Sequence, residues 1–194
     1  MLGKKTLQGP FPPFQSPKTL TAIPVRHSAI QDALIQSSLD PRVRSIGYVA
    51  SAVVASQQVD LDAIVVQRDD GRFFMDVELA RRVRDLDQLG LALIALQQLR
   101  LKRWTIGEEL LGEPRCTNAR FVWLYQKYSV PRKLRERILR ALSGKKAVPL
   151  RELERSVRSV GDPSNAVMSL VCADVLELDL TSQPIQLTTI VKAR

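Results

Sequence analysis

The sequence predicts a mixed α/β (α+β) protein, with a small mixed sheet and helices against it, followed by a smaller helical part. Three observations carry this prediction. Three stretches rich in Val, Ile and Phe lie between residues 43 and 79, and a tight-turn signal separates the last two. A long stretch with helical leucine spacing follows them. The second half then changes to short helical segments that end in an alternating stretch.

Residues 1–24 are predicted to form an extended basic arm. The segment is rich in proline and also carries three lysines; its prolines are Pro10, Pro12, Pro13, Pro17 and Pro24. Because proline lacks an N–H donor and restricts the residue before it, such a segment is typical of unpacked chain. The arm could lie across a partner or a DNA backbone, and simple flexibility is the alternative.

Residues 25–112 are predicted to form the sheet-containing domain, which begins with a helix. In "HSAIQDALIQSSLDP", Ser28 can cap the helix, and apolar residues recur at helical spacing until Pro41 ends it. Strands are predicted at "VRSIGYVASAVVAS" and "VDLDAIVV". Asp70-Gly71 favours a hairpin turn, so "RFFMDVEL" is expected to pair antiparallel with the strand before it.

A long helix is predicted next, within "ARRVRDLDQLGLALIALQQLRLKRW". Its leucines recur every three or four residues and would form one apolar face, at Leu86, Leu89, Leu93, Leu96 and Leu99. The stretch "WTI" then resembles a short closing strand. The predicted order of this domain is therefore helix, three strands, helix and strand.

Residues 113–194 are predicted to form a second domain of helices. The helical segments are "CTNARFVWLYQKY", "VPRKLRERILRAL", "VPLRELERSV" and "PSNAVMSLVCADVLELDL". The final stretch "LDLTSQPIQLTTIV" alternates around a turn and predicts a terminal hairpin. Helices followed by a hairpin are the parts of a winged helix, a module that usually docks one helix into the major groove.

The charge is concentrated in this second part. The formal net charge is +9, and residues 115–158 hold 13 Lys and Arg against 3 Glu. Such a block favours a polyanionic partner, and we expect double-stranded DNA. The candidate phosphate-binding residues are Arg132, Lys133, Arg135, Arg137, Arg140, Lys145 and Lys146. A solvated helix, or a face for a protein partner, is the alternative.

Three carboxylates are the candidate catalytic and metal-binding groups. Side chains alternate along a strand, so Asp76 and Glu78 are expected on one face, and the hairpin would bring Asp62 to the same end of the sheet. Like charges repel, and a divalent cation such as Mg²⁺ or Mn²⁺ would relieve that cost. A metal-bound water could then attack a phosphodiester. Carboxylates that merely end a strand are the alternative.

These features resemble a known family. The motifs are the Ser-Pro-Lys arm, the helix leading to Asp-Pro-x-Val, the acidic residue before "AIVV", and the acidic-Val pair after the turn. Together they resemble the catalytic domain of TnsA, the endonuclease subunit of heteromeric transposases, which has a restriction-endonuclease-like PD-(D/E)XK fold. The segments "TNARFVWLYQKYSVP" and "IQLTTIVK" resemble its C-terminal winged-helix part.

The resemblance implies a DNA endonuclease acting at transposon ends within a multi-protein complex, together with a transposase subunit and an ATPase regulator. Asp62 and Asp76 would hold the metal. Glu78 stands where the family has lysine, and Gln31 where it has a helical glutamate, so the active site would be altered. Lys102 or an arginine of "ARRVR" could supply the missing cation. The alternative is a non-catalytic relative that binds DNA or a regulatory partner.

The remaining composition predicts an intracellular, cytoplasmic protein with no membrane contact. Two cysteines, Cys116 and Cys172, form neither a disulfide framework nor a zinc cluster with the single histidine, His27. The N-terminus lacks the apolar core of a signal peptide, and no run approaches the roughly 18 apolar residues of a membrane span.

Overall fold

The chain divides into two compact units. The computed structural model describes residues 11–144, 147–157 and 162–194. The first unit comprises Met1–Leu34 and Arg42–Glu109, and the second comprises Ile35–Pro41 and Leu110–Arg194. The division after Glu109 falls close to the predicted boundary between residues 112 and 113. It also assigns the last turn of the first helix to the second unit, which the sequence did not predict.

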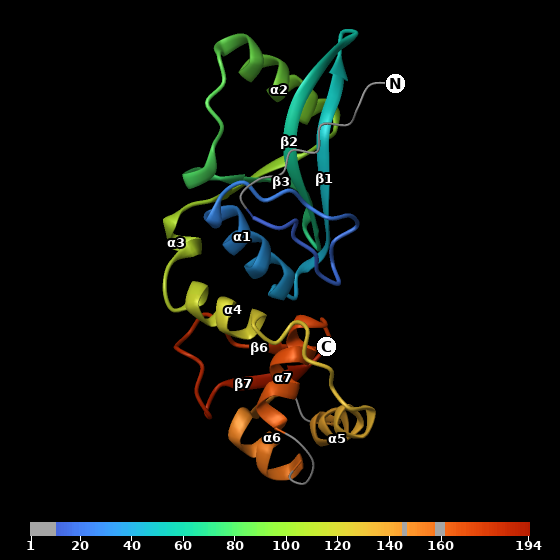
Figure 1. The fold of residues 1–194 in the computed structure, drawn as a ribbon, viewed down its shortest axis with the longest axis vertical. Coiled ribbons are helices and arrows are strands. Elements are labelled where there is room, and N and C mark those ends of the chain that lie inside the picture. Colours follow the sequence, from blue (N-terminus) through green and yellow to red (C-terminus); the bar gives the residue numbers. More distant parts are fainter. Residues whose placement is uncertain (1–10, 145–146, 158–161) are drawn as a thin grey trace. The chain divides into compact units, whose positions relative to one another are not determined.

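The first unit contains a four-stranded mixed sheet (Figure 1). Its elements are α1 (Ser28–Leu39), β1 (Val43–Val54), β2 (Gln57–Arg68), β3 (Gly71–Val77), the 3₁₀ turn η1 (Glu78–Ala80), α2 (Leu86–Gln98) and β4 (Lys102–Ile106). The strand order is β1-β2-β3-β4, with β3 and β4 parallel and the other pairs antiparallel. Parallel strands need a crossover connection, and α2 provides it. The predicted order of helix, three strands, helix and strand is confirmed.

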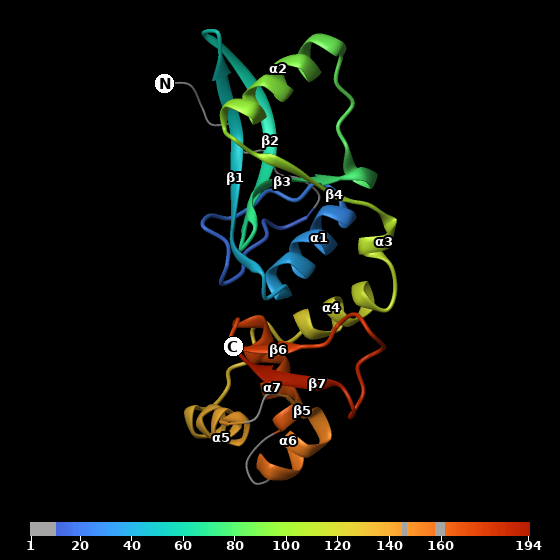
Figure 2. The same cartoon turned by 180° about the vertical axis from the view of Figure 1, so that it is seen from behind.

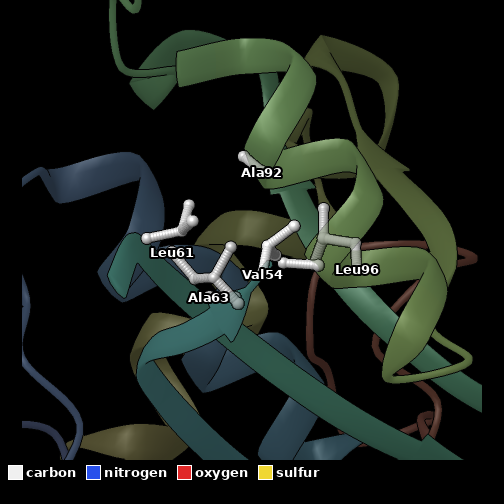
Figure 3. Close-up of a cluster of buried hydrophobic side chains, with 7 residues drawn as sticks. Val54, Leu61, Ala63, Ala92 and Leu96 are labelled. Carbon is white, nitrogen blue, oxygen red and sulfur yellow. The ribbon is translucent and has the colours of Figure 1, made fainter. Parts of the chain in front are cut away.

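One buried apolar cluster of this unit lies between α2 and the first two strands (Figure 3). Ala92, Ala95 and Leu96 of α2 are buried with apolar residues of β1 and β2, among them Val54 and Leu61. Asp85 begins the helix, because its carboxylate accepts a hydrogen bond from the backbone N–H of Gln88 at 2.7 Å. The buried face is therefore built largely on alanine.

The predicted leucine face of α2 is only partly correct. Of its five leucines only Leu96 is fully buried, whereas Leu86, Leu89 and Leu93 are exposed. The helix also begins later than predicted, at Leu86, because Asp85 caps it there. Periodicity identified the helix, but small alanines pack closer to the sheet than leucines would, so the buried face lies to one side of the leucines.

The predicted extended arm is wrong for its second half. Phe14 and Ile23 are buried and pair with each other as an antiparallel bridge. Thr19 bridges to Ile46 of β1, and the Ile46 N–H donates to the Lys18 carbonyl at 2.8 Å. The apolar residues between the prolines therefore attach this segment to the edge of the sheet, where proline's missing donor is tolerated. Residues 1–10 of the predicted arm lie outside the described residues.

The turn between β2 and β3 follows the Asp70-Gly71 signal. Gly71 has a φ of 140°, a conformation that glycine adopts without a side-chain clash, and it pairs with Arg68. The guanidinium carbon of Arg68 lies 5.4 Å from the ring centroid of Phe73 and 4.8 Å from that of Trp104. These cation–π contacts join β2 to β3 and β4 across this end of the sheet.

The second unit combines helices with a small antiparallel sheet (Figure 2). After the short α3 (Glu108–Leu111), its elements are α4 (Arg115–Trp123), α5 (Arg132–Leu142), β5 (Val148–Pro149), α6 (Leu150–Val157), α7 (Pro163–Cys172), β6 (Leu176–Leu178) and β7 (Ile190–Ala193). The strand order is β5-β7-β6. Helices α5, α6 and α7 contact one another. The predicted terminal hairpin is confirmed by the antiparallel pairing of β6 and β7.

A buried asparagine fixes the segment between β6 and β7. The amide nitrogen of Asn118 donates to the carbonyls of Leu180 and Gln183, and its amide oxygen accepts from the Ile185 N–H at 3.1 Å. Because buried polar groups must be hydrogen-bonded, the Asn118 side chain holds this segment in one conformation.

Among the described residues, no helix combines the length and hydropathy needed to cross a bilayer.

Candidate functional site

Asp62 lies at a β-bulge in β2. Val49 pairs with Ala63 and Ser51 with Asp60, so two residues of β2 oppose the single residue Ala50 of β1. Asp62 has a φ of 48°, a left-handed conformation that aspartate tolerates better than most residues. The guanidinium of Arg84 donates to the carbonyls of Asp60 and Leu61 and so holds the bulge.

The bulge changes the predicted alternation of β2. In a regular strand Asp60 and Asp62 would lie on one face, but their side chains are 64% and 9% exposed, respectively. The extra residue re-aims Asp62 toward the inside of the unit, which a regular strand would not do.

The carboxylate of Asp62 is held by two cations and a phenol. The Tyr48 hydroxyl donates to Oδ1 at 2.6 Å, and Arg26 donates to Oδ2. Nη1 of Arg82 lies 3.5 Å from Oδ2 and binds Asp60 at 2.9 Å. Burial, and secondly the hydrogen bond to Asp62, raise the pKa of Tyr48 above its ordinary value, so the phenol remains a hydrogen-bond donor.

Asp76 lies on β3, where it pairs in register with Thr105 of β4. Arg81 binds its carboxylate through two nitrogens, with Nε 3.0 Å from Oδ1 and Nη2 2.7 Å from Oδ2. Nε of Arg103 lies 3.7 Å from Oδ2. The hydrogen bonds to Asp76 are the main reason that the pKa of Arg81 is raised above its ordinary value. A bidentate pair of this kind fixes both side chains.

Glu78 does not share the strand face of Asp76, so that expectation is wrong. The strand ends at Val77, and Glu78 begins the 3₁₀ turn η1, where strand alternation no longer applies. Its Oε1 accepts a hydrogen bond from Nη2 of Arg81 at 3.3 Å. A Cβ atom at Gly107 would lie only 2.9 Å from Oε2, so the carboxylate lies against the backbone that follows β4.

Both aspartates line one pocket of about 160 Å³ in the first unit. The other charged residues of its lining are all arginines, namely Arg26, Arg81, Arg82, Arg84 and Arg103. Its apolar wall comes from β2, β3 and α2, and Ile30 of α1 also contributes. Glu78 and Gln31 are not part of the lining. The lining thus carries three more positive than negative side chains.

The carboxylates as arranged do not fit the predicted divalent cation. All four oxygens of Asp62 and Asp76 accept hydrogen bonds, from Tyr48, Arg26 and Arg81. Within the part of the chain that the structure describes, no three His, Cys, Asp or Glu side chains form a group able to hold a metal. The expected convergence of three carboxylates is therefore wrong, because Glu78 leaves the strand and each of the other two carboxylates is paired with arginine.

The basic residues of α5 form a second candidate site. Leu134, Ile138 and Leu142 are buried, as their spacing predicts. The predicted phosphate-binding residues of the helix, Arg132, Lys133, Arg135, Arg137 and Arg140, are all exposed. Nε of Arg132 binds Glu136 at 2.8 Å. Lys145 and Lys146, which were predicted to extend this face, lie outside the described residues.

Some of the pocket arginines could be anticipated from the sequence. "ARRVR" was expected to supply a cation, and its Arg81 and Arg82 do contact the aspartates. Arg26 and Arg103 were missed, because each approaches its aspartate only through the fold of the unit. Lys102 was the other candidate, but it pairs with Phe73 near the opposite end of β3 and is not part of the pocket.

No protein-family model matches the chain. No curated protein sequence is significantly similar to it either.

Proposed function

We propose that this protein is a TnsA-like, nuclease-fold subunit that binds double-stranded DNA in a transposition complex, and that arginines keep its nuclease-like site from cutting. The observation that carries this proposal is the pocket shared by Asp62 and Asp76. Two aspartates on neighbouring strands reach one cavity, as in a metal-dependent nuclease, but guanidinium groups take the place of the cation.

The charge of the pocket supports phosphate binding without metal. The guanidinium of Arg103 contacts Asp76 only at 3.7 Å, beyond hydrogen-bonding distance, and its side chain is 53% exposed. Arg81 uses Nε and Nη2 for its carboxylates, while a guanidinium has five N–H donors. An anionic backbone phosphate at the mouth of the pocket could therefore add contacts without displacing the aspartates.

The second unit supplies the other part of the proposal. Its helices and terminal hairpin have the parts of a winged helix, and α5 presents a row of basic side chains. Contacts of this kind bind phosphates with strong salt dependence and little sequence preference. The proposed role is thus attachment to DNA at the transposon ends, beside a separate subunit that cuts.

One experiment tests both halves of the proposal. Binding of duplex DNA to the full chain would be measured in EDTA by fluorescence anisotropy. The EDTA-free protein would then be titrated with Mn²⁺ and with Mg²⁺ in a calorimeter. We expect DNA binding in EDTA that weakens steeply with salt. We also expect the same heat of metal titration for the wild type and Asp62→Ala, and no nicking of supercoiled plasmid. Absence of DNA binding at low salt would contradict the proposal.

A second candidate is an active metal-dependent endonuclease, and the exposure of the arginines favours it. The side chains of Arg26, Arg81 and Arg82 are 35–49% exposed above the buried aspartates, so they have room to move aside. This candidate predicts a heat of Mn²⁺ binding that Asp62→Ala abolishes, together with plasmid nicking. Asp85→Ala is the matched control, because its carboxylate caps α2 and lies outside the pocket.

A further inference from the structure

The exposed face of α2 is unusually apolar. Among the described residues, six of the eleven large exposed hydrophobic side chains lie between Leu79 and Ile94. We call them the apolar stripe; its members are Leu79, Val83, Leu86, Leu89, Leu93 and Ile94. Leu86 alone is 85% exposed. Contiguous apolar surfaces of this kind mark interaction sites more often than ordinary solvent-facing surface.

Charged residues, which normally cover the outer face of a surface helix, are nearly missing from α2. Helix α2, Leu86–Gln98, contains a single charged residue, Asp87. Its inner face is already packed on the sheet through Ala92, Ala95 and Leu96 (Figure 3). A helix that is apolar on both faces is expected to be covered on both. The outer face therefore lacks the partner that its composition requires.

The spacing of the stripe fits another helix. Leu86, Leu89 and Leu93 follow the i, i+3, i+7 pattern by which one helix packs along another. Leu89 and Leu93 also line the pocket, so the stripe continues into a concave surface. A partner helix would lie along the stripe with one edge over the mouth of the pocket.

The charge beside the stripe specifies the partner's chemistry. Arg81, Arg82 and Arg84 lie directly before α2, and the pocket lining has three excess positive side chains. The acidic residues of the same segment are Asp85, which caps α2, and Asp87. A second copy would therefore bring arginines toward arginines, whereas an acidic helix would bring carboxylates toward them.

We propose that the apolar stripe is the docking site for an amphipathic, acidic helix of another protein. The helix places its apolar residues on Leu86, Leu89 and Leu93, and its carboxylates toward the arginines at the mouth of the pocket. This inference goes beyond DNA binding, because it assigns a protein partner to the apolar stripe, which adjoins the pocket but is not itself a phosphate-binding surface.

The test uses the full chain and three labelled synthetic peptides of about three heptads. The first has leucine at the a and d positions with glutamate at the flanking positions. The second carries lysine in place of every glutamate, and the third has the composition of the first in scrambled order. We expect the acidic peptide to bind at least tenfold more tightly than either of the others, as measured by fluorescence anisotropy.

Two variants of the chain locate the binding. Val83→Gln with Leu86→Gln is expected to weaken binding of the acidic peptide tenfold or more, while leaving duplex DNA binding unchanged, because neither side chain lines the pocket. Leu20→Gln is the matched control, since Leu20 is 73% exposed in the same unit but lies outside the stripe. If the double variant fails to fold by circular dichroism, Leu86→Gln alone serves, because that side chain is almost fully exposed.

Three results would overturn the inference. Equal binding of the acidic and basic peptides would remove the charge argument. Binding that survives both substitutions would place the peptide elsewhere. A wild-type dimer in light scattering that becomes monomeric on Val83→Gln with Leu86→Gln would identify a second copy of the chain as the occupant.

Discussion

The two units carry their arginines in opposite settings. Around the pocket of the first unit the guanidinium groups contact carboxylates, as Arg81 does with Asp76 and Arg82 with Asp60. Along α5 of the second unit five basic side chains share one exposed face, and Glu136 is the helix's single acidic residue. The pocket arginines thus mostly contact carboxylates, whereas α5 has one carboxylate for five basic side chains.

The two settings favour two kinds of electrostatic interaction, one at contact distance and one at longer range. Paired guanidinium groups produce little field at a distance, but they hold a defined geometry for a ligand that comes within contact. An excess of like charges on one helix attracts a polyanion over about one Debye length, roughly 10 Å at 0.1 M salt. We therefore expect α5 to dominate affinity and salt dependence, and the pocket to contribute short-range contacts.

The largest expected effect comes from α5. Lys133→Gln with Arg135→Gln should lower duplex affinity about tenfold or more at about 0.1 M salt, because two phosphate contacts are lost. The slope of log K against log[salt] should fall by about 2 in magnitude. Anisotropy titrations at several salt concentrations measure both. Arg44→Gln with Arg72→Gln removes the same charge from exposed positions of the first unit; an equal effect there would erase the difference between the units.

The pocket should respond in the opposite direction. Asp76→Asn removes a negative charge from its floor, so duplex affinity should rise about two- to fivefold, the scale of one exposed ion pair. The midpoint of urea unfolding should fall, because Arg81 loses its bidentate acceptor. Glu78→Gln removes the same charge outside the pocket lining and should change affinity less. A fall in affinity with Asp76→Asn would instead favour a carboxylate that works with metal.

An alkaline transition should report on the first unit. Burial and the Asp62 hydrogen bond raise the pKa of Tyr48, so in the folded chain the phenol keeps its proton at a pH where the unfolded phenol, with a pKa of about 10, loses it. Stability from this group is fully present below pH 10 and decreases as pH rises above it. The midpoint temperature of thermal unfolding should fall less steeply between pH 9 and 11 in Tyr48→Phe than in the wild type. Parallel curves for the two proteins would show that neither burial nor Asp62 raises the pKa of this phenol.

The smallest expected effect concerns the cysteines, which both lie in the second unit. Burial raises the pKa of Cys172 to about 12, and Cys116 is buried too. Because the thiolate is the reactive form, neither should react with a thiol reagent near neutral pH unless the unit opens. Labelling followed by mass spectrometry measures this opening. Rapid labelling of both thiols in the native protein would mean that the second unit is much less stable than its core implies.

Much of the fold could be predicted from periodicity and turn chemistry. Strand alternation and Asp70-Gly71 located β1 to β3, and the leucine spacing located α2. The errors occur where packing overrides a local signal. Phe14 and Ile23 attach a proline-rich segment to the sheet, and alanines rather than leucines form the buried face of α2.

The candidate site could be predicted only in part. The sequence indicated that Asp62 and Asp76 approach one another, and both line the same pocket. It could not show the bulge, because a single inserted residue is selected by the pairing of two strands. Nor could it show that Arg26, 36 positions before Asp62, reaches that carboxylate. Contacts between residues distant in sequence are decided by tertiary structure and leave no local pattern.

The stacking of Arg68 on Trp104 has a consequence for spectroscopy. The chain has two tryptophans, and each unit holds one: Trp104 in the first and the buried Trp123 in the second. Tryptophan fluorescence therefore has one source in each unit. Removal of the Arg68 guanidinium beside Trp104 should change the emission of Trp104 and not that of Trp123. In Trp104→Phe the remaining emission comes from Trp123 alone, and in Trp123→Phe it comes from Trp104. Denaturation of each half can thus be followed within the intact chain, without cutting it in two.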